Sequence, residues 1–217
     1  MEISLTNAGK RFRFDWIFRE LTCSLRSGQR VALIGPNGSG KSTLMKVLAG
    51  HLSLSKGQIV FKNDAGTVVP PEEVYQWVSY AAPYIELIEE FTLEEAIQFH
   101  CRLKPLLPGL TPEKLYEILD LPKALQKEIR FFSSGMKQRV KLAFAICSNT
   151  PIVLLDEPST NLDVRAVAWF HDLLNTYHND RLILIATNDP TDLELCGDRL
   201  DVMGYKKKVG PLRLASG

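Results

Sequence analysis

Residues 35–43 read Gly-Pro-Asn-Gly-Ser-Gly-Lys-Ser-Thr, and this stretch decides the fold. It follows the apolar β pattern of residues 31–34 and precedes helix-period residues 42–49, the context that indicates a phosphate-binding loop. Glycines let the backbone curl so that successive N–H groups face phosphate oxygens, and the following helix directs its positive end at the same anion. The predicted phosphate-binding residues are Gly35, Pro36, Asn37, Gly38, Ser39, Gly40, Lys41, Ser42 and Thr43. Among them, Lys41 is predicted to bridge the β- and γ-phosphates as a catalytic group, and the Ser42 hydroxyl to hold Mg²⁺.

A second chemical element lies far downstream, where residues 152–158 read Ile-Val-Leu-Leu-Asp-Glu-Pro. The four apolar residues predict a buried strand that delivers Asp156 and Glu157 to its carboxyl end, where ligands collect in parallel sheets. Asp156 is predicted to anchor Mg²⁺, and Glu157 to act as the catalytic base that positions water. An Asp-Glu pair after a strand is often only the start of a loop, but a phosphate loop in the same chain favours a nucleotide site.

The bulk composition excludes several other classes of function. The chain has 217 residues and a net charge of +1, so no broad basic face for nucleic acid is implied. No apolar stretch reaches the roughly 20 residues of a membrane span, and the start lacks the pattern of a secretion signal. The four cysteines are scattered without metal-type or redox-type spacing, which favours a reducing compartment. A cytosolic protein is expected, with the basic run 206–208 as a solvated tail.

Strand and helix patterns predict one α/β domain with an inserted helical lobe. Short strand patterns occur at residues 3–5, 21–25, 57–61 and 74–80. Further along, the strands 152–155 and 182–186 alternate with helices 134–148 and 164–177, which indicates a parallel sheet covered on both faces.

Between these regions, residues 86–130 are helical in character. Thr92 with Glu95 reads as a capping box, and Thr111 followed by Pro112 reads as a second helix start. We therefore assign residues 1–33 and 57–82 to a β lobe, 34–56 and 139–217 to the nucleotide-binding core, and 84–138 to a helical lobe.

With these motifs in place, nearly the whole chain resembles the nucleotide-binding subunits of ABC transporters. The segment Phe132-Ser-Ser-Gly-Met-Lys-Gln-Arg139 is similar to the family's signature loop, although Ser134 and Met136 replace a Gly and a Gln. The resemblance implies that Ser133 and Gly135 contact the γ-phosphate bound by a partner copy. Residues 159–163 resemble the family's D-loop and imply that Asp163 lies at the dimer seam.

The resemblance also implies an aromatic residue that stacks on adenine. Phe12 follows Lys10-Arg11 at the corresponding place and is predicted to be this residue. Phe14 and Trp16 lie close by, and each of the three aromatic residues could instead pack within the β lobe.

Two positions depart from the family pattern around the γ-phosphate. Pro83 stands where the family has a Gln that touches Mg²⁺ and water, and proline has no side-chain amide. Glu86 is a candidate to replace this Gln, although its position fits a solvated loop residue better. Asn188 replaces the family's switch His; its amide can donate a hydrogen bond to the phosphate as a catalytic group but cannot carry positive charge.

The fold expected from the resemblance is an ABC-type α/β domain with a P-loop NTPase core, a small antiparallel β lobe and an inserted helical lobe. The implied activity is hydrolysis of ATP with Mg²⁺ by a homodimer that forms on ATP and drives a separate integral-membrane permease subunit. This places the chain in the cytoplasm, peripheral to the inner face of the membrane.

Two alternatives remain open. Pro83 and Asn188 also fit an ATP-dependent dimerisation or regulatory module with little turnover. A soluble ABC ATPase acting on DNA or ribosomes is disfavoured by the single nucleotide domain and the nearly neutral charge. His171 and His178 have no third metal ligand at suitable spacing and are expected to pack as ordinary residues.

Overall fold

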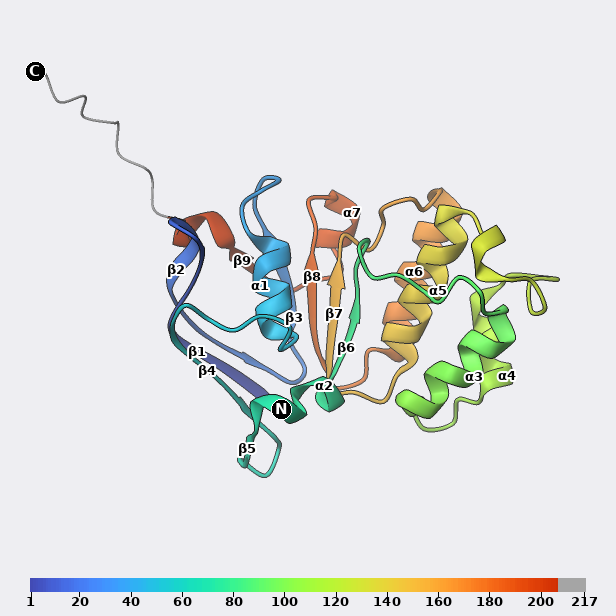
Figure 1. The fold of residues 1–217 in the computed structure, drawn as a ribbon, viewed down its shortest axis with the longest axis horizontal. Helices are drawn as coiled ribbons and strands as arrows, with labels where there is room; N and C mark the ends of the chain where they lie inside the picture. The colour runs from blue at the N-terminus through green and yellow to red at the C-terminus, as the bar shows by residue number, and fades with distance from the viewer. Residues whose placement is uncertain (207–217) are drawn as a thin grey trace, which may run out of the picture.

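A five-stranded parallel sheet forms the centre of the protein in the computed structural model, which describes residues 1–206 (Figure 1). Its strand order is β6 (Val78–Ala81), β7 (Ile152–Asp156), β8 (Leu182–Ala186), β3 (Arg30–Ile34) and β9 (Asp198–Asp201). Every pairing between neighbours is parallel. Because parallel strands share one carboxyl edge, the loops that follow β3, β7 and β8 meet there.

A second, antiparallel sheet lies beside this core. Its order is β2 (Asp15–Arg26), β1 (Glu2–Phe12), β4 (Lys56–Lys62) and β5 (Val68–Val69). Helix α1 (Lys41–Leu48) lies between the two sheets in Figure 1. Its apolar residues join the antiparallel sheet and one face of the parallel sheet in a single buried cluster.

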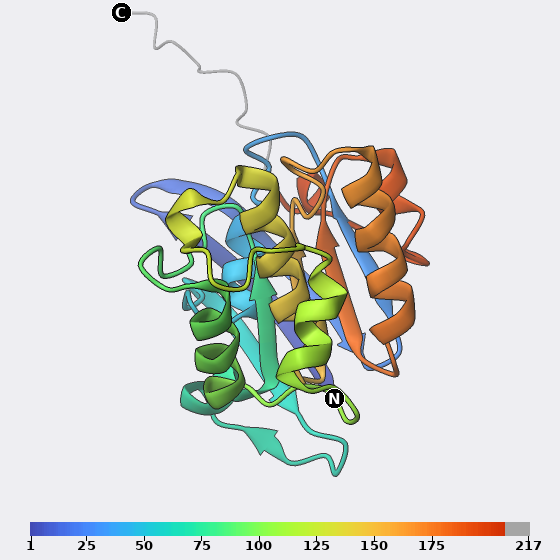
Figure 2. The ribbon, with the colours of Figure 1, turned by 90° about the vertical axis from the view of Figure 1, so that its right-hand side faces the viewer.

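Alternation along the central strands divides the interior into two cores. In β7, Ile152 and Leu154 pack on the α1 side, whereas Val153 and Leu155 pack against the helices of the opposite face. That face is covered by α5 (Ser134–Cys147) and α6 (Val164–Tyr177), which Figure 2 shows running beside the sheet. A strand that is buried on both sides must be apolar throughout, which explains the continuous apolar run that the sequence shows.

The helical lobe adds α3 (Leu93–Leu103) and α4 (Pro112–Leu119) next to α5. The predicted capping box is present, because Thr92 Oγ1 accepts a hydrogen bond from the Glu95 amide while the Glu95 carboxylate accepts from the Thr92 amide. At α4, the Thr111 side chain accepts a hydrogen bond from the Lys114 amide, and Pro112 occupies a position that needs no N–H donor.

Short elements complete the described chain. They are the 3₁₀ helices η1 (Pro71–Glu73), η2 (Ile129–Phe131) and η3 (Val202–Tyr205), and the helices α2 (Val74–Trp77) and α7 (Pro190–Leu193). None of the helices in residues 1–206 combines the length and the apolar character that a membrane crossing requires. The basic run predicted as a solvated tail lies outside the described residues from Lys207 onward.

The structure corrects the assignment of two strands. Val78–Ala81 was expected in the β lobe but pairs with β7, and Arg30–Ile34 was divided between lobe and core but lies wholly in the parallel sheet. Residues 74–77 form a helical turn where a strand was expected. Pro71, Glu72 and Glu73 begin that helical stretch, and local pattern alone does not say which sheet a short apolar strand will join.

Leu154 offers a direct test of the central core, because its side chain is completely buried in β7. We expect Leu154→Ala to lower the free energy of unfolding by about 2–5 kcal/mol through lost burial and the cavity left behind. Val164→Ala, at an 88% exposed position, should change it by no more than about 0.5 kcal/mol. Urea unfolding followed by circular dichroism measures both, and equal effects would contradict the two-core description.

Candidate functional site

The phosphate loop is built around a buried lysine. Lys41 is only 5% exposed, and its ammonium group donates a 2.7 Å hydrogen bond to the Gly35 carbonyl. Gly40 precedes α1 at φ 109°, and a Cβ there would lie 2.5 Å from Ile17 Cγ2. The helix start has no side-chain cap, so its N–H groups remain available to an anion. A cavity lies over this loop and is lined by Ile17, residues 37–43 and Glu157.

Two buried polar atoms beside the loop have no hydrogen-bond partner in the described chain. They are Ser39 Oγ and Asp156 Oδ1, and Asp156 is only 1% exposed. Leaving such atoms unpaired is costly unless a ligand satisfies them. A buried carboxylate oxygen beside a phosphate cradle is a ligand of the kind that Mg²⁺ takes together with phosphate oxygens, and a hydroxyl can donate to a phosphate, so the residues present fit both groups.

Glu157 lies next to Lys41, with 3.7 Å between Oε1 and the ammonium nitrogen. Its backbone has φ 48°, a left-handed conformation that is uncommon outside glycine, and its amide donates to the Ala186 carbonyl at 2.7 Å. Burial raises the pKa of the Glu157 carboxyl; Lys41 opposes this, while Asp156 and Asp192 reinforce it. A carboxyl with a raised pKa is suited to accept a proton from water.

Asn188 reaches the same loop from the end of β8. Its side chain amide lies 3.1 Å from Asn37 Oδ1. In the amide orientation that suits its neighbours, its nitrogen donates to Gly35 O at 2.7 Å and its oxygen accepts from Lys41 Nζ at 3.1 Å. The structure therefore brings Lys41, Glu157 and Asn188 together.

Two tyrosines that the sequence did not single out lie against Asp156. The Tyr84 hydroxyl donates to Asp156 Oδ2 at 2.9 Å, and the Tyr80 hydroxyl lies 3.5 Å from the same oxygen. Burial raises the pKa of both phenols well above the usual range, and the Asp156 charge adds to the effect. Both hydroxyls therefore remain hydrogen-bond donors. Only the adjacency of Tyr84 to Pro83 could have drawn attention to it in the sequence.

Asp192 was also missed, although it joins two loops of the site. This fully buried carboxylate accepts from Ser159 Oγ at 2.5 Å and from Thr187 Oγ1 at 3.1 Å. His171 Nε2 lies 3.1 Å from it, so this histidine has a specific partner. Asp192 thus ties the loop after Glu157 to the loop that carries Asn188.

The signature-loop residues lie on a different surface from the cradle. Ser133 Oγ accepts from the Met136 amide at the start of α5, and Asp163 caps α6 by accepting from the Ala166 amide. A Cβ on Gly135 would lie 2.9 Å from the Asn161 carbonyl, so glycine permits these loops to pack closely. Ser133, Gly135 and Asp163 line a cavity of their own.

Phe12 is not among the residues that line the cradle cavity. It lies at the end of β1, is 47% exposed, and has the Lys10 ammonium 5.2 Å from its ring centroid. The residue of the antiparallel sheet that lines this cavity is instead Ile17, whose Cγ2 would lie 2.5 Å from a Cβ on Gly40. Adenine stacking by Phe12 therefore stays a prediction.

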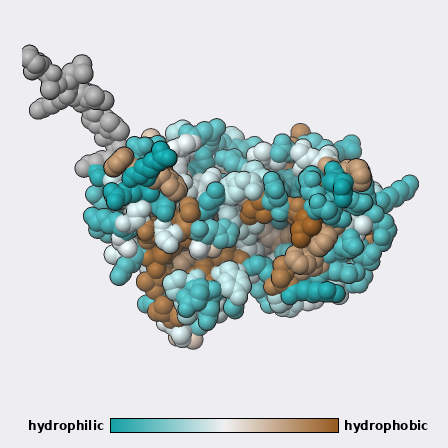
Figure 3. Space-filling model, viewed as in Figure 1, coloured by the Kyte–Doolittle hydropathy of each residue, from teal (hydrophilic) through white to brown (hydrophobic). Residues whose placement is uncertain are grey.

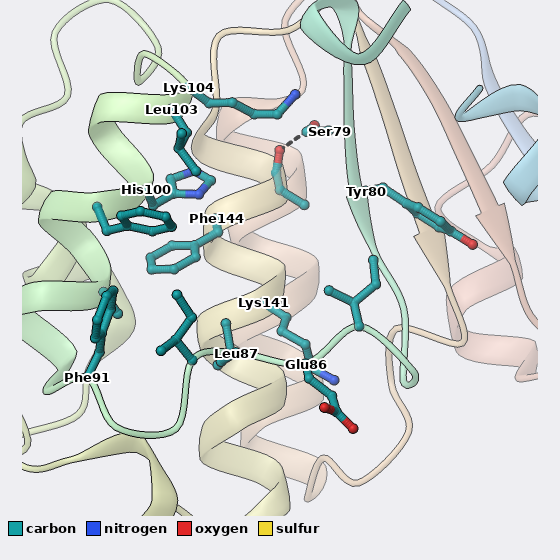
Figure 4. Close-up of a pocket in the computed structure, with 15 residues that line it drawn as sticks. Ser79, Tyr80, Glu86, Leu87, Phe91, His100, Leu103, Lys104, Lys141 and Phe144 are labelled. Atoms are coloured by element: carbon teal, nitrogen blue, oxygen red, sulfur yellow. Dashed lines mark hydrogen bonds between the residues drawn. The ribbon is translucent and has the colours of Figure 1, made fainter. Parts of the chain in front are cut away.

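An apolar groove opens between β6 and the helical lobe, with a volume of about 330 Å³. Figure 3 shows apolar side chains gathered beside a hollow on this face. In Figure 4, His100 and Phe144 stack in the groove with ring centroids 4.2 Å apart, and Glu86 and Lys141 lie at one end. Glu86 thus lines the groove instead of reaching the cradle cavity.

A glycine-rich phosphate loop on a parallel sheet, a strand-terminal Asp-Glu pair and an inserted helical lobe define an ATP-binding cassette. The family model described as ABC transporter matches residues 18–160. The chain belongs to the ABC transporter family, as the sequence resemblance predicted. Its fold is also the predicted one, with a parallel core, an antiparallel sheet and helices.

Curated relatives agree. The chain is 24% identical over 212 residues to the uncharacterized ABC transporter ATP-binding protein YhcH of Bacillus subtilis, covering 95% of this chain and 68% of that protein. It is 29% identical to the sulfate/thiosulfate import ATP-binding protein CysA of Halalkalibacterium halodurans, covering 95% of this chain and 60% of the relative. Against mouse ATP-binding cassette sub-family A member 17 it is 29% identical, covering 85% of this chain but 11% of the relative.

Solved structures show the same fold. A putative ABC transporter ATP-binding protein from Pyrococcus furiosus superposes with a TM-score of 0.80 at 20% identity, covering 95% of this chain and 100% of the other. The ATP-binding cassette MJ0796, a dimer bound to ADP and Pi in a post-hydrolysis state, gives 0.78 at 19% identity, covering 93% and 95%.

His100 in the groove makes stability depend on pH. Burial, with the nearby Lys104 charge, lowers its pKa from 6.5 to about 4, while the Phe144 carbonyl opposes this. Between these values the unfolded chain binds the proton and the folded chain does not, so stability should fall as pH falls from about 6.5 towards 4. The contribution of this group is at most about 1.4 kcal/mol per pH unit.

His100→Gln should make the loss of stability on acidification shallower. His51→Gln, which removes an imidazole at an exposed position, is the matched control. Urea unfolding at pH 7, 6 and 5 measures the slopes. The same slope in His100→Gln as in wild type would show that the folded state tolerates the charged ring.

Proposed function

We propose that the chain is the ATP-binding and ATP-hydrolysing subunit that powers an ABC-type membrane transporter. One observation carries this proposal: Lys41 and Glu157 face each other over a phosphate loop, beside a buried Asp156 oxygen that no other described residue satisfies. The loop supplies anion binding, the lysine a positive charge, and the glutamate a base. These are the parts that hydrolysis of a nucleoside triphosphate needs.

The chemistry starts from side chains that are already gathered at the loop. Lys41 and the Asn188 amide would exchange their contacts with the Gly35 carbonyl for phosphate oxygens, Asn188 donating to the terminal phosphate. Glu157 orients a water molecule in line with that phosphate and takes up its proton. Ser42 and Asp156 would hold Mg²⁺, which when bound neutralises charge on the phosphates.

A second copy of the chain completes the site in this proposal. Ser133, Gly135 and Asp163 line a cavity distinct from the cradle, so within one chain they do not meet the phosphate site. In a head-to-tail homodimer that forms on ATP, Ser133 and Gly135 would face the partner's γ-phosphate. Closure on ATP and opening after hydrolysis would then supply the mechanical stroke.

The apolar groove is the argument for the partner that this movement would drive, a permease subunit encoded as a separate chain. A helix with an apolar face fits a groove lined by Leu87, Phe91 and Phe144, with Glu86 and Lys141 at its rim. The chain would then work in the cytoplasm, at the inner face of the membrane. Because the net charge is only +1, we expect no nucleic-acid partner.

A slow regulatory module is the competing proposal. Pro83 offers no amide to the site, and Asn188 cannot become positively charged. Losing one aligned polar contact to a transition state costs about 10²–10³ in rate. Glu157 favours reduced turnover over its absence.

Steady-state ATP turnover with Mg²⁺ separates the two proposals. Glu157→Gln should lower turnover by about 10²–10⁴-fold while leaving ATP binding intact, because the amide cannot accept a proton. Glu90→Gln, at an exposed position, is the matched control and should behave as wild type.

The double variant Pro83→Gln/Asn188→His tests the regulatory module. Turnover that appears only in this variant would favour that module. Turnover in Glu157→Gln equal to wild type would overturn the assignment of the base.

A further inference from the structure

Asp156 has two carboxylate oxygens in different situations. Oδ2 accepts the Tyr84 hydroxyl at 2.9 Å and has the Tyr80 hydroxyl 3.5 Å away, and the two hydroxyls also contact each other. Oδ1 is buried and has no hydrogen-bond partner among residues 1–206. A carboxylate can turn about its Cβ–Cγ bond, so a hydrogen bond to one oxygen fixes where the other points.

The segment that carries Tyr84 is itself held from two helices. On the α1 side, the Lys46 ammonium lies 4.0 Å from the centroid of the Tyr84 ring. On the α5 side, Lys141 Nζ donates to the carbonyls of Ala82 and Pro83 at 3.2 and 3.3 Å. Tyr84 therefore has a defined position between the phosphate-loop helix and the helix that follows the signature loop.

Strand β6 separates the groove from the nucleotide site. Successive side chains of the strand point to opposite faces, and in Figure 4 Ser79 points to α5 while Tyr80 points away from the groove. Ser79 donates to the Ala145 carbonyl of α5 at 2.7 Å. The chain that leaves β6 then forms part of the groove wall at Ile85 and Glu86. Tyr84 thus lies between groove-lining residues and Asp156.

We propose that Tyr84 is a positioning residue for Asp156: its hydroxyl holds Oδ2 so that Oδ1 faces the metal. The proposal rests on the proposed function, in which Asp156 holds Mg²⁺. Pro83 leaves the segment without a side-chain amide, and the tyrosine next to it supplies the polar contact instead.

The test measures equilibrium binding of the β,γ-imido analogue of ATP by calorimetry, once with Mg²⁺ and once with EDTA. The ratio of the two dissociation constants is the affinity gained through the metal. Tyr84→Phe should lower this gain by about tenfold, the usual size of the effect when a group that orients a metal ligand is removed. The affinity in EDTA should stay unchanged, which also shows that the variant is folded.

Two further tyrosine variants calibrate this result. Tyr80→Phe should reduce the gain by less than Tyr84→Phe, because its hydroxyl lies farther from Oδ2. Tyr116→Phe is the matched control: its hydroxyl donates to the Leu121 carbonyl in the helical lobe, away from the cradle, and the gain should not change. A gain in Tyr84→Phe equal to or larger than that of wild type would overturn the positioning role.

Asp156→Asn separates failure of this proposal from failure of the proposed function. If Asp156→Asn keeps the full affinity gain from Mg²⁺, Asp156 does not hold the metal. That result would contradict both the role of Asp156 in the proposed function and the positioning role of Tyr84. If it loses the gain, Tyr84→Phe in that background must cause no further loss, because Tyr84 acts through the carboxylate. An additional loss in the double variant would mean that Tyr84 acts by another route.

Discussion

A buried ammonium group must be surrounded by oxygen atoms, and the nucleotide site is organised around that constraint at Lys41. The Gly35 carbonyl, the Glu157 carboxylate and the Asn188 amide oxygen supply these oxygens. Phosphate would replace the first and leave the second beside the reacting atoms. The loop glycines, the start of α1 and the end of β7 hold Gly35, Lys41 and Glu157 in place.

The parallel sheet makes this convergence possible because β3, β7 and β8 end at one edge. Asp192 adds a connection that the strands do not provide, since its hydrogen bonds to Ser159 and Thr187 join the loops that follow β7 and β8. The two loops are therefore linked through one buried carboxylate. Tyr84, which follows strand β6, makes a separate contact with the same edge through Asp156.

The sequence predicted the central strands, the caps of α3 and α4, and the meeting of Lys41, Glu157 and Asn188, because each depends on local pattern or on shared strand ends. Sheet membership was predicted wrongly for Val78–Ala81, since short apolar strands look alike in either sheet. Tyr84 and Asp192 were not foreseen, because their roles come from side-chain directions that only the packed chain defines.

At Glu157, the left-handed backbone lowers the stability of the fold, whereas the proposed chemistry needs the glutamate side chain at this position. A non-glycine side chain at φ 48° carries strain that the surrounding loop must hold, and burial of its carboxyl adds a further cost. Glycine or asparagine adopts this conformation more readily. In a variant library selected only for thermal tolerance, the favoured replacements at Glu157 would remove the carboxylate that we propose as the catalytic base, so selection for robustness would act against that proposed role.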